Sequence, residues 1–124
     1  MNSESMRATL RTTKALSDIQ RLRILLMLRA GELCVCRIVA VLELAPSTVS
    51  KHLSLLRDAG LLDCRKDGRW AYYRLPQGEA FKAVKPVLKW LEDALGNEAS
   101  VLADAEKVKT ALSCAPEGRS RRYA

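Results

Sequence analysis

Two cysteines separated by one residue, Cys34 and Cys36, are the side chains of this chain whose type and spacing suit the binding of a soft ion. On a regular helix, side chains two positions apart point about 200° away from each other, so both sulfurs cannot hold one ion there. They can converge where the backbone at a helix start is extended or unwound. A thiophilic ion held by both is expected to distort that helix, and the helix N-terminus is expected to lower the thiol pKa.

The bulk composition limits the class of protein. A chain of 124 residues fits one domain, with little room for a second core. Its 21 Lys and Arg against 14 Asp and Glu give a net charge of +7, which favours nucleic acid as a partner before an anionic membrane surface. Residues 1–11 do not resemble a secretion signal and no run is long enough to span a bilayer, so we expect a cytoplasmic protein with reduced cysteines and no membrane partner.

The apolar periodicity and the turn residues predict a mainly α chain with a β-hairpin wing. Ser17 and Gln20 resemble a capping box, and Asp67-Gly68 is typical of a hairpin turn. Helices are expected over 5–16, 17–30, 33–42, 46–59, 79–95 and 98–112, and strands over 61–65 and 70–75. This order predicts a dimeric winged helix–turn–helix over residues 1–96, which binds DNA and dimerises, followed by a C-terminal helix and a basic flexible tail over 97–124.

The surface expected to bind double-stranded DNA combines the helix over 46–59 with the hairpin tip. A helix enters the major groove with hydrogen-bonding side chains near its N-terminus, and a basic wing reaches the adjacent backbone or minor groove. His52 lies on the same helix and could contact phosphate or pack under the wing. With this lone histidine and no glycine-rich phosphate loop, we expect no enzyme activity. The predicted DNA-binding residues are Ser47, Thr48, Ser50, Lys51, His52, Lys66 and Arg69.

The helix over 79–95 carries apolar residues spaced like a coiled-coil seam. We predict that this seam pairs with the first helix of a second subunit, because a two-fold dimer is what a palindromic operator requires. The alternative is ordinary packing within the chain. The predicted seam consists of Phe81, Val84, Leu88, Leu91 and Leu95.

Three runs of sequence, taken together, resemble the arsenic-responsive repressor (ArsR/SmtB) family. The resemblance implies a homodimeric repressor that leaves its operator when arsenite, antimonite or a soft divalent metal binds, and so controls an arsenic-resistance operon. It also implies that Cys34 and Cys36 are the inducer ligands. The runs are Glu-Leu-Cys-Val-Cys at 32–36, Ser-Thr-Val-Ser-Lys-His-Leu-Ser-Leu-Leu-Arg-Asp-Ala-Gly-Leu-Leu at 47–62 and Arg-Lys-Asp-Gly-Arg-Trp-Ala-Tyr-Tyr-Arg-Leu at 65–75.

Two departures from the family's arsenic site leave the third ligand open. Arg37 and Val39 stand where that site has an acidic residue and a third cysteine. A third sulfur must come from Cys64, from Cys114 or from a small thiol such as glutathione, unless the ion is two-coordinate.

Other inducers remain as alternatives. The cadmium and lead branch of the family adds cysteines from an N-terminal arm, and none precedes Cys34 here. Its zinc members use a histidine of the last long helix, which residues 79–95 lack. Arsenite or antimonite is therefore favoured over cadmium or lead. An oxidative switch, in which Cys34 or Cys36 pairs with Cys64 or Cys114, is the other alternative.

Overall fold

The computed structural model describes the backbone of residues 2–113 and the side chains of residues 4–110. The predicted mainly α fold with a β wing is confirmed, whereas Cys114 and the predicted flexible tail lie outside the described residues. Among residues 2–113, no helix is both long and apolar enough to cross a bilayer. In chain order the elements are α1 (Asn2–Ala15), α2 (Ile19–Met27), the 3-10 helix η1 (Leu28–Ala30), β1 (Leu33–Cys34), α3 (Val35–Leu42), α4 (Pro46–Asp58), β2 (Asp63–Asp67), β3 (Trp70–Arg74), α5 (Glu79–Leu95) and α6 (Ala99–Ser113).

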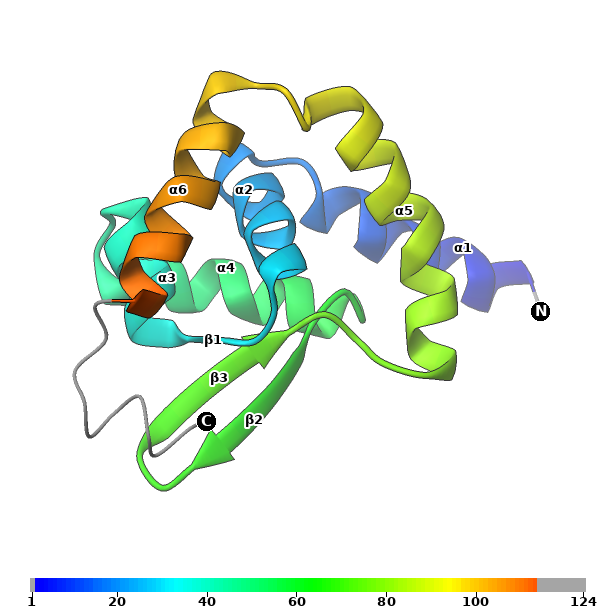
Figure 1. Ribbon diagram of the computed structural model, residues 1–124. Coiled ribbons are helices and arrows are strands. Elements are labelled where there is room, and N and C mark those ends of the chain that lie inside the picture. The colour runs from blue at the N-terminus through cyan, green and yellow to red at the C-terminus, as the bar shows by residue number, and fades with distance from the viewer. Residues whose placement is uncertain (1, 114–124) are drawn as a thin grey trace.

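The helices form one body from which the small sheet projects, and the connection between α5 and α6 lies on the side away from the sheet (Figure 1). The centre of this body is α2, which contacts α4, α5 and α6. Its Ile24 and Leu25 are fully buried, together with Ile38 of α3 and Leu53 of α4. A single apolar core therefore holds the helix–turn–helix of α3 and α4 against the rest of the chain.

The helix α4 has the bounds that its sequence predicts. Proline at its first position has no N–H to leave unsatisfied, and Gly60 adopts a positive φ of 79° just after its end. Val49, Leu53 and Leu56 are completely buried, and each such side chain stabilises the fold by about 1.5–3 kcal/mol. The face opposite these residues stays in contact with solvent.

The start of α2 differs from the prediction by one residue. The N-cap is Asp18 rather than Ser17, because the Asp18 carboxylate accepts hydrogen bonds from the backbone N–H groups of Gln20 (2.7 Å) and Arg21 (3.3 Å). Aspartate and serine are equally good caps, so local sequence does not separate them. Gly31 follows the short helix η1 with a φ of 127° and leads the chain into β1.

The sheet contains a strand that the sequence pattern does not predict. It has the order β1-β3-β2 and is antiparallel throughout, with β1 formed by Leu33 and Cys34 alone. Leu33 pairs with Tyr73 and Cys34 with Tyr72. A strand of two residues shows no alternation of apolar and polar positions, so periodicity cannot detect it.

The helix α5 has the predicted bounds and contains Pro86 in its interior. The prediction that its apolar seam pairs with a second subunit is wrong for Leu88 and Leu91, which are buried within the chain, as Val84 is, because α5 packs on α2. Phe81 and Leu95 are half-buried.

Candidate thiolate site and DNA-binding surface

The two sulfurs of Cys34 and Cys36 meet at the junction of β1 and α3. Cys34 is the N-cap of α3, with extended backbone angles (φ −67°, ψ 145°), and Cys36 lies in the first turn of the helix. Their Sγ atoms are 2.6 Å apart, and the Cys36 N–H donates to the Cys34 Sγ at 3.4 Å. Convergence at an extended helix start is thereby confirmed. The sulfurs already converge on an intact helix without an ion, so bringing them together requires no distortion of α3. Distortion of α3 by a bound ion stays a prediction.

The electrostatics of Cys34 also differ from the prediction. Burial, followed by the hydrogen bond with Cys36, raises the pKa of the Cys34 thiol to about 11. The backbone N–H groups of Cys36 and Arg37 act in the opposite direction and are outweighed. The expected lowering of the thiol pKa by the helix N-terminus is therefore wrong for Cys34, because loss of water penalises the thiolate more than the helix stabilises it.

The third predicted sulfur, Cys64, lies on the other face of the sheet. Residues paired across strands share a face: one row is Leu33, Tyr73 and Cys64, and the other contains Cys34 and Tyr72. Cys64 is also two strands from β1, or roughly 10 Å. This separation prevents a disulfide or a shared ion between Cys64 and Cys34 of one subunit while the sheet is intact.

The surroundings of Cys64 agree with this placement. Burial and a hydrogen bond with Cys64 raise the pKa of Tyr73, while Arg57 of α4 acts on the same hydroxyl in the opposite direction. The Cys64 thiol is thus engaged beside the helix–turn–helix. Across residues 2–113, no group of three His, Cys, Asp or Glu side chains could hold a metal ion.

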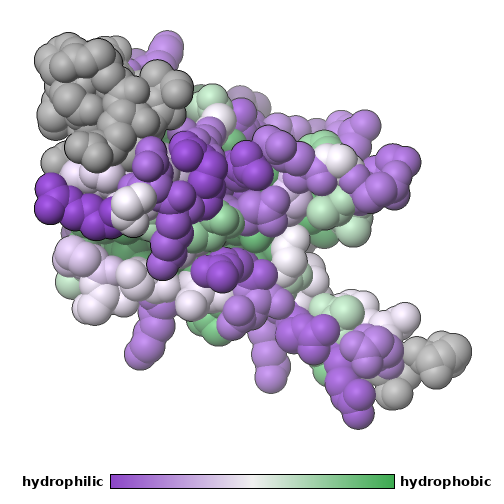
Figure 2. All heavy atoms as spheres, turned by 90° about the horizontal axis from the view of Figure 1, so that it is seen from below, coloured by the Kyte–Doolittle hydropathy of each residue, from purple (hydrophilic) through white to green (hydrophobic). Residues whose placement is uncertain are grey.

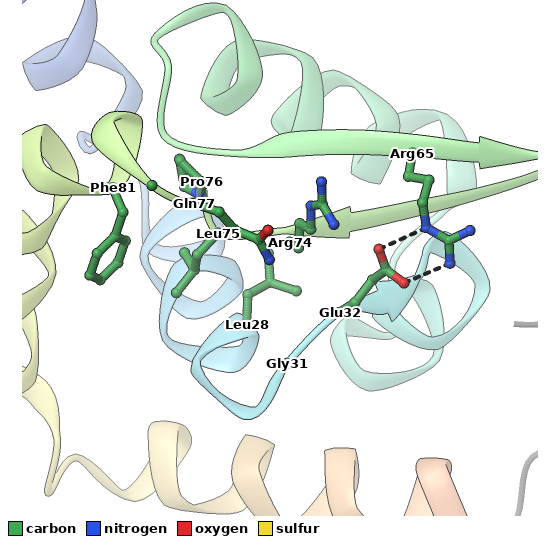
Figure 3. Close-up of a pocket in the computed structure, with 10 residues that line it drawn as sticks. Leu28, Gly31, Glu32, Arg65, Arg74, Leu75, Pro76, Gln77 and Phe81 are labelled. Atoms are coloured by element: carbon green, nitrogen blue, oxygen red, sulfur yellow. Dashed lines mark hydrogen bonds and ion pairs between the residues drawn. The ribbon is translucent and has the colours of Figure 1, made fainter. Parts of the chain in front are cut away.

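An ion pair beside the two cysteines was not predicted. The Arg65 guanidinium donates to both Glu32 carboxylate oxygens, through Nε (3.1 Å) and Nη2 (2.7 Å), and this contact lowers the pKa of Glu32 (Figure 3). Glu32 belongs to the motif that carries Cys34, and Arg65 belongs to the wing strand β2. The charge pattern alone could not have indicated the pair, because it depends on the pairing of β1 with β3.

The predicted major-groove residues lie where the helix–turn–helix prediction places them. Ser47, Thr48, Ser50 and Lys51 are exposed on the N-terminal half of α4. Figure 2 views the molecule from below and shows that mainly hydrophilic side chains cover this side. His52 is half-buried, and its Nδ1 lies 3.1 Å from Nη1 of Arg21 in α2. A hollow of about 360 Å³ beside these residues is lined by Arg21, Ser47, Thr48, Lys51, His52 and Leu55.

The wing tip carries the other predicted DNA contacts. Lys66 and Arg69 are both exposed, and they flank a turn in which Gly68 has a φ of 63°. The Arg69 guanidinium stacks over the Trp70 ring, 5.3 Å from its centroid. The stacking restrains a long side chain that would otherwise lose more rotamer freedom on binding.

The C-terminal helix α6 packs on α2 and α3. Arg23 of α2 forms an ion pair with both carboxylate oxygens of the buried Asp104. Lys107 Nζ lies 3.4 Å from Oε2 of Glu43, the residue that caps the C-terminus of α3. Figure 1 shows α6 beside α3, in agreement with the contacts between the two helices. Its last residue, Ser113, directly precedes Cys114 in the sequence.

A helix–turn–helix followed by a basic β wing defines a winged-helix DNA-binding protein. Residues 18–63 match the family model described as bacterial regulatory protein, arsR family. The chain is 42% identical over 108 residues to the arsenic resistance transcriptional regulator ArsR1 of Pseudomonas putida, an alignment that covers 82% of this chain and 84% of the relative. The chain belongs to the arsR family.

Solved structures agree with this assignment. HlyU from Vibrio cholerae is 32% identical, with a TM-score of 0.64 over 75% of this chain and 97% of that chain. The chain is also 27% identical to Mb0332 from Mycobacterium bovis, with a TM-score of 0.65 over 78% of this chain and 86% of that chain. That structure is described as a homodimeric winged helix-turn-helix DNA-binding domain of a possible ArsR-family transcriptional regulator. The predicted class is confirmed: this protein is a DNA-binding transcriptional regulator and not an enzyme.

Proposed function

We propose that this chain is a homodimeric repressor that leaves a palindromic operator when arsenite or antimonite binds to Cys34 and Cys36, and that it controls an arsenic-resistance operon. The observation that carries the proposal is the 2.6 Å separation of the two sulfurs at the start of α3. This helix leads through a short turn into the reading helix α4, so an ion at its N-terminus acts on the element that seats α4. Similarity to the Pseudomonas putida arsenic regulator supports the choice of inducer.

The chemistry of the inducer suits a pair of protonated thiols. Arsenous acid exchanges a hydroxide for each thiol: one As–O bond breaks, one As–S bond forms, and the thiol proton leaves within a water molecule. A divalent cation instead displaces each thiol proton into solution. Cys34 and Cys36 would hold the ion through their two sulfurs. Bonds from sulfur to such an ion are about 2.3 Å long, so two sulfurs on one ion lie farther apart than 2.6 Å, and rotation of the two side chains would provide this separation.

The third sulfur is proposed to come from Cys114 or from a small thiol such as glutathione. Cys64 of the same subunit is disfavoured by its place on the other face of the sheet. Cys114 directly follows α6 in the sequence, and α6 packs on α3, the helix that begins at the cysteine pair. Retention of full arsenite affinity by Cys114→Ser without added glutathione would count against Cys114 and leave two-coordinate binding.

The homodimer is proposed to form through the exposed apolar side chains of α1 and α5. Met6 and Leu10 of α1 and Trp90 of α5 are all more than half exposed. A second subunit that covers α1 and α5 would remove these large apolar side chains from water. The two-fold symmetry of such a dimer would present two copies of α4 to the two halves of a palindrome.

Operator binding by single-cysteine variants tests the inducer site. Fluorescence anisotropy with a labelled operator measures the dissociation constant with and without arsenite under reducing conditions. Cys34→Ser and Cys36→Ser should bind the operator as the wild type does but should not be released. Cys64→Ser is the matched control and should be released normally. Release of both single variants at wild-type arsenite concentrations would contradict the ligand assignment.

A further inference from the structure

A continuous set of contacts connects the segment that carries the cysteine pair to the wing strands. Cys34 pairs with Tyr72 of β3, which in turn pairs with Arg65 of β2, so the three side chains share one face of the sheet. The Arg65 guanidinium lies over the Tyr72 ring, 4.7 Å from its centroid. It also donates to both carboxylate oxygens of Glu32, two residues before Cys34 in the chain.

The ion pair spans the full width of this small sheet. Glu32 lies directly before β1, the strand at one edge, and Arg65 lies in β2, the strand at the other edge. Figure 3 shows the Glu32 carboxylate facing the Arg65 guanidinium. Arg65 is followed by Lys66, a predicted DNA contact at the exposed end of the wing. The chain segment with the thiols and the strand with the wing cation therefore meet at this contact.

The strand β1 alone is a weak mechanical connection. Only two residues of β1 pair with β3, and an antiparallel pair so short contributes few hydrogen bonds. Cys34 is one of those two residues, so any movement of its backbone on binding an ion would displace half of the strand. Without a second attachment, β1 could shift against β3 and leave the wing where it is.

We propose that Glu32 and Arg65 are positioning residues that transmit occupancy of the Cys34–Cys36 site to the wing. This inference rests on the proposed function, and it adds that release involves the wing cations as well as α4. An inducer can shift DNA affinity only through contacts that differ between the bound and free states. The Glu32–Arg65 pair supplies such a contact, because it forces β2 to follow a movement of the segment that carries Cys34.

The two residues are suited to a clean test because their ion pair is partly exposed. The side-chain exposures are 37% for Arg65 and 25% for Glu32. Ion pairs in contact with water contribute little to stability. Glu32→Gln is therefore expected to fold normally and to bind operator DNA in the absence of arsenite within about threefold of the wild type.

The decisive measurement is the release factor, the ratio of operator dissociation constants with and without saturating arsenite. Glu32→Gln should bind arsenite with wild-type stoichiometry, while its release factor should fall by at least about fivefold. Glu92→Gln is the matched control, because it removes an Arg–Glu pair of similar exposure between Arg29 and Glu92 (3.3 Å) that does not involve β1 or the wing. Its release factor should equal that of the wild type. The exchange Glu32→Arg with Arg65→Glu restores the pair and should restore the release factor.

Tryptophan fluorescence gives a readout that loss of stability would not mimic. Trp70 lies in the wing strand β3, so arsenite should change the emission of the wild type but not that of Trp70→Phe. Glu32→Gln should lose this change while it still binds arsenite. A wild-type release factor in Glu32→Gln with arsenite bound would overturn the coupling role and leave the inducer site intact. Failure of arsenite to release the wild type would overturn the proposed function and this inference together.

Discussion

The ion pair between α2 and α6 allows a quantitative test of what holds the C-terminal helix on the domain. Arg23 donates from Nε and Nη2 to the two Asp104 carboxylate oxygens, each at 2.8 Å. The Asp104 side chain is 4% exposed and the Arg23 side chain 18%. A third Arg23 nitrogen, Nη1, donates to Gln20 at 2.7 Å.

We expect Asp104→Ala to lower the free energy of unfolding by about 2–3 kcal/mol. Removing one partner of a buried ion pair costs about 3–5 kcal/mol, because the remaining charge stays desolvated. The cost here falls below that range because Arg23 keeps its bond to Gln20 and part of its contact with water. With a denaturant slope of about 1–3 kcal/mol per molar urea, the unfolding midpoint should fall by about 0.7–3 M.

Urea denaturation followed by circular dichroism measures this change. Asp93→Ala is the control, since it removes an exposed i,i+4 pair with Lys89 (3.2 Å) and should cost less than about 0.5 kcal/mol. Replacing both charges, by Arg23→Met with Asp104→Leu, should recover most of the loss, because no unpaired charge remains. A loss for Asp104→Ala no greater than that of the control would refute the reasoning.

Two further predictions concern DNA and the inducer. Lys51→Ala should weaken operator binding, and the magnitude of the slope of log affinity against log salt concentration should fall by about 1. A salt titration measures this slope. An unchanged slope would show that Lys51 does not contact phosphate. Since the Cys34 pKa is raised to about 11, a divalent cation must displace its proton throughout the neutral range. Calorimetry should therefore show cadmium affinity rising by at least about tenfold per pH unit between pH 6 and 8, the contribution of the Cys34 proton alone, with arsenite affinity nearly constant. Equal pH dependence of the two would contradict the proposed proton balance.

Local signals predicted the elements that carry the DNA-binding surface. Proline at 46 and glycine at 60 mark the two ends of α4, and Asp67-Gly68 marks the turn of the wing. The buried face of α4 follows from helical spacing, because Val49, Leu53 and Leu56 return to one side at each turn. Exposure of Lys51 follows from the same geometry. These features depend on residues close in sequence, so the sequence is enough to predict them.

Packing between distant segments produced the features that were missed or mispredicted. Local sequence places Cys34 at a helix start, where the thiol pKa falls, but the surrounding core buries the side chain and raises its pKa instead. The spacing of Leu88 and Leu91 predicts a contact with a second subunit, but both side chains are buried within the chain because α5 packs on α2.

Residue types and short-range spacing were thus sufficient to indicate a winged helix–turn–helix with a pair of thiols at its entrance. The strand β1, the separation of Cys64 from Cys34 on opposite faces, and the contact of Glu32 with Arg65 arose only when three segments paired in one sheet. Strand pairing and burial depend on partners far along the chain. No window of neighbouring residues contains those partners, and for this reason the folded molecule, rather than the local pattern, decides how the thiol pair is connected to the wing.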